Sequence, residues 1–136
     1  MYDILPLTKS VRKNNTIYYL TGYAGRKKIK FIYDSEKSRV EIPQNLVEQM
    51  FRSKIISKDD FSDGREKIKL TDGTKLTSRS FKLKELKIGD IVFENVRCKM
   101  VDTGKKPLMG NRIFNDYEGT EIKGDKLYLK KIKDDQ

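Results

Sequence analysis

Short β-prone segments separated by turn signals constrain the fold of this 136-residue chain more than any other feature of its sequence. Alternating or apolar segments flank four such signals, which are Ala24-Gly25, Asp72-Gly73, Gly89-Asp90 and Gly124-Asp125. Dipeptides of this kind favour tight hairpin turns, because glycine readily adopts the positive φ angles that these turns require. The sequence therefore predicts four antiparallel hairpins, with strands at 16–20 and 28–33, 67–70 and 75–78, the two sides of 88–90, and 120–123 and 126–129.

Two segments do not follow the strand pattern. Residues 42–51 read IPQNLVEQMF, in which Pro43 suits the first turn of a helix, and residues 110–119 allow one or two helical turns. The predicted fold class is thus mainly β and antiparallel, with one or two short helices. A chain of this length builds one modest core, so we expect a single domain over residues 1–136. The segments 1–15 and 132–136 are expected at its periphery.

The residue types that are missing exclude several classes of enzyme. The chain has no histidine and a single cysteine, so it has no internal disulfide, no Ser-His or Cys-His nucleophile pair and no histidine metal site. Acid-base chemistry near neutral pH is left to carboxylates, Lys, Tyr and Cys98. Cys98 alternates with apolar neighbours, which predicts a buried and inert thiol. We expect neither a metal nor a cofactor.

The net charge of +10 suggests a polyanion such as nucleic acid as a partner. However, residues 1–68 carry 14 basic and 9 acidic side chains and residues 69–136 carry 16 and 11, so each half contributes +5. This even distribution favours a lysine-rich solvated surface, and a specific polyanion site remains an alternative. No apolar run is long enough to span a membrane, and the start MYDILPLTKS has no features of a signal peptide. The compartment is not determined by these features.

Residues 31–43, FIYDSEKSRVEIP, combine an apolar strand, an Asp-Ser pair, a second short strand and an Ile-Pro that opens a helix. In this order they resemble the retropepsin-like aspartic proteases, specifically the single-domain bacterial members. The resemblance continues in residues 69–101, which are similar to the flap hairpin and the long strands after it. It ends in PLMGNRIF at 107–114, which is similar to the segment that enters the C-terminal helix. Together these parts span about residues 16–130.

The resemblance implies a small closed antiparallel β-barrel that works as a homodimer on a peptide or protein. Asp34 would be the catalytic aspartate, paired with Asp34 of a second chain, and the Ser35 hydroxyl would link the two active-site loops. Peptide hydrolysis would then proceed by general acid-base chemistry, with no metal and no covalent intermediate. The flap tip would comprise Thr71, Asp72, Gly73 and Thr74, and the loop behind the active site would comprise Leu108, Met109 and Gly110.

The chain departs from the family pattern at the centre of the motif. Glu36 and Lys37 stand where the family has Gly and Ala, and a second copy of Glu36 in the dimer would add further negative charge beside the aspartates. Activity therefore stays open, and the alternatives are an inactive peptide-binding module with the same fold or a basic β domain that binds a polyanion. Asp102-Thr103-Gly104 matches the Asp-Thr/Ser-Gly motif of the proteases better than Asp34-Ser35-Glu36 does. Only 136 − 104 = 32 residues follow it, and Lys-Lys-Pro comes next, so we interpret it as an exposed loop.

Overall fold

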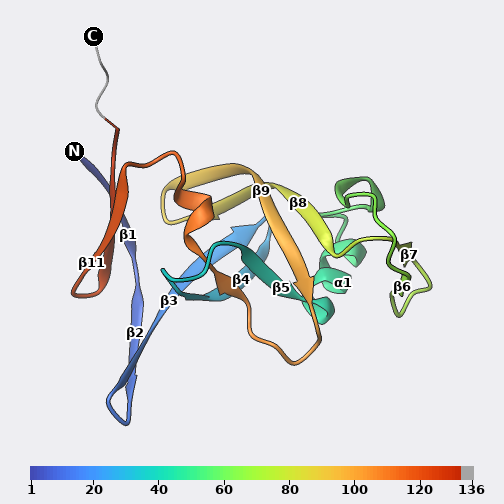
Figure 1. Ribbon diagram of the computed structural model, residues 1–136, viewed down its shortest axis with the longest axis horizontal. Helices are drawn as coiled ribbons and strands as arrows, with labels where there is room; N and C mark the ends of the chain where they lie inside the picture. The colour runs from blue at the N-terminus through green and yellow to red at the C-terminus, as the bar shows by residue number, and fades with distance from the viewer. Residues whose placement is uncertain (133–136) are drawn as a thin grey trace.

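Seven strands form the main sheet of the computed structural model, which describes residues 1–132 (Figure 1). An additional pairing joins β3 to β8, where Gly22 lies opposite Ile88, so that the strands from β3 to β8 form a closed ring. The mainly β class predicted from the sequence is confirmed. In spatial order the strands are β2 (Thr8–Arg12), β3 (Asn15–Ala24), β4 (Lys27–Tyr33), β10 (Leu108–Met109), β5 (Val40–Pro43), β9 (Ile91–Val101) and β8 (Ser80–Ile88).

All four predicted hairpins are present. They are β3–β4, the small two-stranded sheet of β6 (Ile68–Lys69) and β7 (Lys75–Leu76), β8–β9, and β11 (Gly119–Lys123) with β12 (Lys126–Lys130). Gly25 and Gly89 have φ angles of 60° and 58°, which explains the glycine at these turns. Strand β3 is longer than predicted, since it runs from Asn15 to Ala24, whereas β6 and β7 are each only two residues long and shorter than predicted. Pairing on both sides extends a strand beyond the residues whose own propensity favours it.

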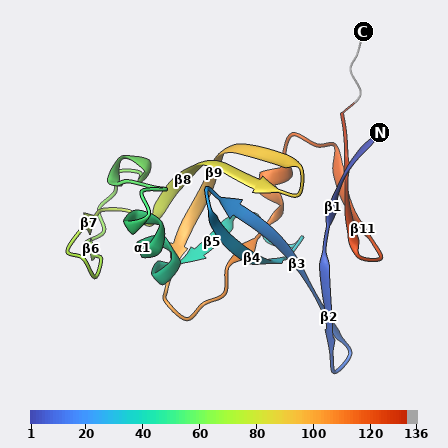
Figure 2. The ribbon, with the colours of Figure 1, turned by 180° about the vertical axis from the view of Figure 1, so that it is seen from behind.

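A second, three-stranded sheet has the order β1-β12-β11, in which β1 (Tyr2–Pro6) runs antiparallel to β12. It lies at one side of the molecule, near both ends of the described chain, and the β2–β3 hairpin projects from the ring of strands (Figures 1 and 2). Residues 1–15 were expected at the periphery, yet they form β1 and β2, and Leu5 is fully buried. Of the C-terminal segment expected there, Ile132 is exposed and residues 133–136 lie outside the described part.

One α-helix, α1 (Gln44–Arg52), follows β5 directly, as the segment 42–51 predicts. Pro43 ends β5 in an extended conformation and occupies the N-cap position of the helix instead of lying in its first turn. Two short 3₁₀ helices complete the structure, η1 (Lys58–Asp60) and η2 (Asn111–Phe114), the latter within the segment 110–119 that was expected to be helical. No helix within residues 1–132 is long and apolar enough to cross a membrane.

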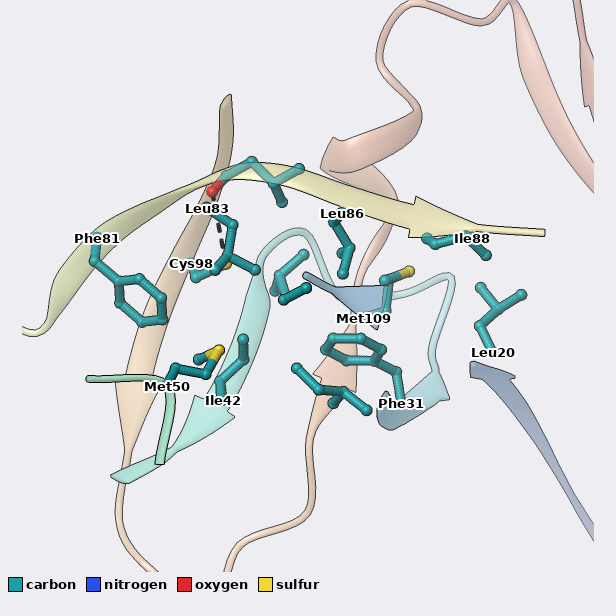
Figure 3. Close-up of a cluster of buried hydrophobic side chains, with 14 of the residues drawn as sticks. Leu20, Phe31, Ile42, Met50, Phe81, Leu83, Leu86, Ile88, Cys98 and Met109 are labelled. Atoms are coloured by element: carbon teal, nitrogen blue, oxygen red, sulfur yellow. Dashed lines mark hydrogen bonds between the residues drawn. The ribbon is translucent and has the colours of Figure 1, made fainter. Parts of the chain in front are cut away.

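Buried apolar side chains from the ring of strands, from α1 and from the two smaller sheets form one cluster in the described residues. Figure 3 shows Phe31 from β4, Leu86 from β8 and Met109 from β10 within it. Each such side chain contributes about 1.5–3 kcal/mol by leaving water, so this cluster is the main source of stability. Cys98 lies there with 4% of its surface exposed, and burial raises the pKa of its thiol to about 12. The burial of Cys98 that the alternation predicts is confirmed.

Candidate active site

Asp34 is the first residue after β4, at the end of that strand that pairs with β10. Leu108 and Met109 run parallel to Ile32 and Tyr33, and the Asp34 amide donates a hydrogen bond of 3.0 Å to the Met109 carbonyl oxygen. The opposite edge of β10 pairs with β5. Strand β10 therefore lies between β4, which precedes Asp34, and β5, which follows it. Asp34 is therefore half-buried and held at a fixed position relative to three strands.

Residues 34–37 form a tight turn around the Asp34 carboxylate. The Lys37 amide donates to the Asp34 carbonyl oxygen at 3.2 Å, and the Glu36 amide donates to the Asp34 carboxylate oxygen Oδ1 at 3.0 Å. A carboxylate that accepts a hydrogen bond from the backbone two residues later is a standard Asx turn. The second carboxylate oxygen accepts no hydrogen bond from residues 1–132. One oxygen thus orients the side chain while the other is available to a ligand.

Gly110 closes the back of this turn. A Cβ atom built on Gly110 would lie 2.6 Å from both the carbonyl carbon and the carbonyl oxygen of Lys37, so only glycine fits. Three consecutive amides then bond the turn. Those of Gly110, Asn111 and Arg112 donate to the carbonyl oxygens of Arg39 at 3.0 Å, Lys37 at 2.9 Å and Ser38 at 2.8 Å. The segment 110–112 therefore fixes the backbone of the turn from behind.

Asn111 is a site residue that our reading of the sequence missed. Its side-chain amide donates to the Ser35 carbonyl oxygen at 3.1 Å, and its Oδ1 accepts the Tyr33 hydroxyl at 2.5 Å. The Tyr33 hydroxyl also lies 3.5 Å from Thr120 Oγ1, and burial raises the pKa of Tyr33 above its ordinary value. Asn111 thus links both sides of Asp34. No local signal marks it, because its partners are more than 70 residues away.

Glu36 and Lys37 are both exposed, as is Ser35. Within residues 1–132, the non-glycine residues with positive φ angles are Lys13, Asn14, Lys54 and Asn95, so Glu36 adopts the turn without backbone strain. The glycine of the family pattern is therefore not needed here for its backbone freedom.

The turn that was predicted to form a flap, Thr71–Thr74, lies on α1. The Thr71 hydroxyl donates a hydrogen bond to the Glu48 carboxylate, and this bond is the main reason that the pKa of Glu48 is lowered. Within the turn, the Thr74 amide donates to Asp72 Oδ1 at 2.9 Å, and Gly73 has a φ of 91°. Figures 1 and 2 show β6, β7 and α1 together at one end of the molecule, away from the connection between β4 and β5. The structure does not bring this turn to Asp34.

Asp102 lies in the connection between β9 and β10. It follows Val101, which pairs with Pro43 at the end of β5, whereas Met109, next to the Asp34 turn, pairs with Val40 at the start of β5. The Asp102 side chain is 79% exposed, and its carboxylate lies 3.8 Å from the Arg79 guanidinium. The two Asp-led turns are therefore at opposite ends of β5. Within residues 1–132, no group of three or more Cys, Asp or Glu side chains could hold a metal ion.

No protein-family model matches the sequence, and no curated protein matches it either. Among solved structures, the chain is similar to the crystal structure of a retropepsin-like aspartic protease from Rickettsia conorii. The two share 19% sequence identity and superpose with a TM-score of 0.60, over 95% of this chain and 90% of that one. The fold is therefore retropepsin-like, as the resemblance in residues 16–130 implied.

Proposed function

We propose that this chain is a retropepsin-like aspartic endopeptidase domain that acts as a homodimer, with Asp34 of each chain forming the catalytic pair. The observation that carries the proposal is the framework around Asp34. The residue follows a central strand, its amide bonds the Met109 carbonyl oxygen, and Gly110 packs directly behind the turn. A framework of this kind holds a carboxylate in one orientation, which catalysis by positioned acid and base groups requires.

The Asp34 carboxylate oxygen that accepts no hydrogen bond would carry out the acid-base chemistry. In a dimer the two carboxylates would lie close together and share one proton, because like charges at short distance are not both ionised. The ionised carboxylate would take a proton from water, which attacks the peptide carbonyl, while the protonated one would hydrogen-bond the carbonyl oxygen. The bond then breaks as the leaving nitrogen is protonated. No covalent intermediate forms in this sequence of steps.

The dimer is required by the number of catalytic groups. Each chain supplies one Asp34 turn, and one carboxylate does not act as base and acid at the same time in this mechanism. The exposed Ser35 beside Asp34 supports the proposal, since its hydroxyl is accessible to the facing loop of a partner. Sedimentation velocity over a range of concentrations tests this step. A chain that stays monomeric at the concentrations where it cleaves peptides would contradict the shared pair.

Peptide cleavage is the direct test of the activity. Incubation with a diverse peptide library between about pH 3 and pH 7 is expected to yield products that depend on Asp34. The matched variants are Asp34→Asn, which should lose cleavage, and Asp102→Asn, which should keep it. Absence of cleavage at every pH, or cleavage that survives Asp34→Asn, contradicts the proposal.

The second candidate function is a peptide-binding module that keeps the fold without catalysis. Glu36 favours it, since a charged residue stands at the position where the family has glycine, which has no side chain. Two copies of Glu36 in a dimer would add negative charge beside the aspartates and reduce the ionised base that activates water. In this case Glu36→Gly combined with Lys37→Ala should raise a low rate of cleavage. A wild-type rate typical of active aspartic endopeptidases rules this candidate out.

The Thr71–Thr74 turn acts as a flap in this proposal only if it moves. It would have to leave α1 and lose the hydrogen bond from Thr71 to Glu48 before it could reach a substrate at Asp34. Glu48→Gln weakens that bond by removing its charge. If the turn closes over substrates, this variant should raise kcat/KM, through a lower KM or a higher kcat.

A further inference from the structure

A cavity of about 450 Å³ lies on the outer face of the β8–β9 ribbon and continues to the residues that flank the Asp34 turn. Its lining contains two serines, Ser62 and Ser80, and no acidic side chain. We call it the basic groove, after the five cationic residues that line it, namely Arg39, Lys82, Arg97, Lys99 and Arg112.

Strand register explains why these charges gather. Lys82 of β8 lies directly opposite Arg97 of β9, and Lys99 follows two residues later on the same face. Their neighbours Phe81 and Cys98 point into the core instead. Like charges opposite one another on a sheet are unfavourable by themselves. The arrangement is therefore one that a bound anion would relieve.

Little in the described chain neutralises the basic groove. Within residues 1–132, Arg39 pairs with Glu41 at 3.0 Å, whereas the other four cations have no carboxylate within 4.0 Å. A cleft lined by one sign of charge concentrates ions of the opposite sign. The guanidinium groups of Arg97 and Arg112 can in addition hold a carboxylate through two parallel hydrogen bonds.

The basic groove shares its backbone framework with Asp34. The Arg39 carbonyl oxygen accepts the Gly110 amide, and the Arg112 amide donates to the Ser38 carbonyl oxygen at 2.8 Å. The backbone of two of the five cationic residues is thus held by the same hydrogen bonds that position the Asp34 turn. The basic groove therefore adjoins the segment that follows Asp34, where a peptide bound at Asp34 could reach it.

We propose that the basic groove binds an acidic side chain of the peptide and so makes the chain selective for acidic peptides. The assignment of this peptide as a substrate rests on the proposed function, but the binding does not. A nucleic acid fits less well, since single strands are held by aromatic rings that stack on bases. The aromatic residue of the lining is Phe81, which is 2% exposed.

The test is a binding measurement in the Asp34→Asn background, so that cleavage plays no part. The probes are a fluorescein-labelled peptide of alternating Glu and Ala, its matched peptide of alternating Gln and Ala, and oligothymidylate of equal charge. Fluorescence anisotropy at low salt should show the Glu peptide binding about 10-fold or more tightly than the Gln peptide. Arg97→Gln with Arg112→Gln should abolish this preference.

The control pair is Lys28→Gln with Lys87→Gln, which removes the same charge from exposed positions outside the groove. It should retain the preference. If the first pair lowers the Tm, Lys82→Gln with Lys99→Gln replaces it. Equal binding of the Glu and Gln peptides, a preference that both groove pairs retain, or tighter groove-dependent binding of oligothymidylate overturns the proposal. If the wild-type protein cleaves no peptide while the binding preference is intact, only the proposed function is contradicted.

Discussion

The turns that begin at Asp34 and at Asp102 have similar sequences and very different surroundings. Asp34 follows a central strand and is bonded by the amides of Glu36 and Lys37, with Gly110 packed behind the turn. Asp102 is exposed and contacts Arg79 at 3.8 Å, and a Cβ atom on Gly104 would meet no atom within 4 Å. The better match to the protease motif is thus the turn without a framework. In this chain the framework goes with the residues packed behind the turn, and not with how well the turn matches the motif.

The largest expected difference between the two turns is in activity. Asp34→Asn removes the proposed base and acid, and should reduce peptide cleavage by about 100-fold to 10,000-fold. Asp102→Asn should leave kcat/KM within about twofold, because its carboxylate lies at the other end of β5 from Asp34. Initial rates on one peptide at the optimal pH give the comparison. A similar loss in both variants would remove the distinction drawn between the turns.

Gly110→Ala should have the next largest effect, on stability. The added methyl group would lie 2.6 Å from the Lys37 backbone, which must then shift, and we expect a loss of about 2–3 kcal/mol in the free energy of unfolding. The matched control is Gly119→Ala, where a Cβ atom would meet nothing within 4 Å. That variant should change by less than about 1 kcal/mol. Urea denaturation measures both, and equal losses would contradict the tight packing behind Asp34.

Asn111→Ala should cost about 1–2 kcal/mol, since it removes the bond to the Ser35 carbonyl oxygen and one partner of the Tyr33 hydroxyl. It should also lower kcat, because the turn loses a support on one side. Asn115→Ala is the control, as Asn115 is exposed near the end of η2. Denaturation and initial rates are compared for both. An Asn111→Ala variant as stable and active as the control would show that the Asn111 side chain is not needed to hold the turn.

The smallest effect concerns Tyr33, which precedes Asp34, whereas Val101 precedes Asp102. Burial raises the pKa of Tyr33, so the folded state prefers the protonated phenol. This preference is fully present below the unfolded value of about 10 and is lost as the pH rises towards the folded value. The free energy of unfolding should therefore fall more steeply above pH 10 in the wild type than in Tyr33→Phe. Parallel curves for the two proteins would contradict the assignment.

Several features of the fold were predictable because their causes are local. The turn dipeptides identified all four hairpins, and the segment 42–51 identified α1, since both depend on residues a few positions apart. Strands β1 and β2 were missed. The segment 1–15 has weak alternation, and β1 is held by its pairing with β12, more than 100 residues later. Non-local pairing of this kind leaves little trace in a short window of sequence.

The features of the candidate site also divide into those with local causes and those that depend on distant residues. The sequence by itself determined the mainly β class, the apolar strand that ends just before Asp34 and the Ile-Pro that leads into α1. The tertiary structure alone decided that Gly110 and Asn111 lie against residues 34–38, that the Thr71–Thr74 turn lies on α1, and that five cations share one groove. The physical reason is that local propensity depends on neighbours along the chain. Contacts between distant residues depend instead on the order in which strands pair around the ring.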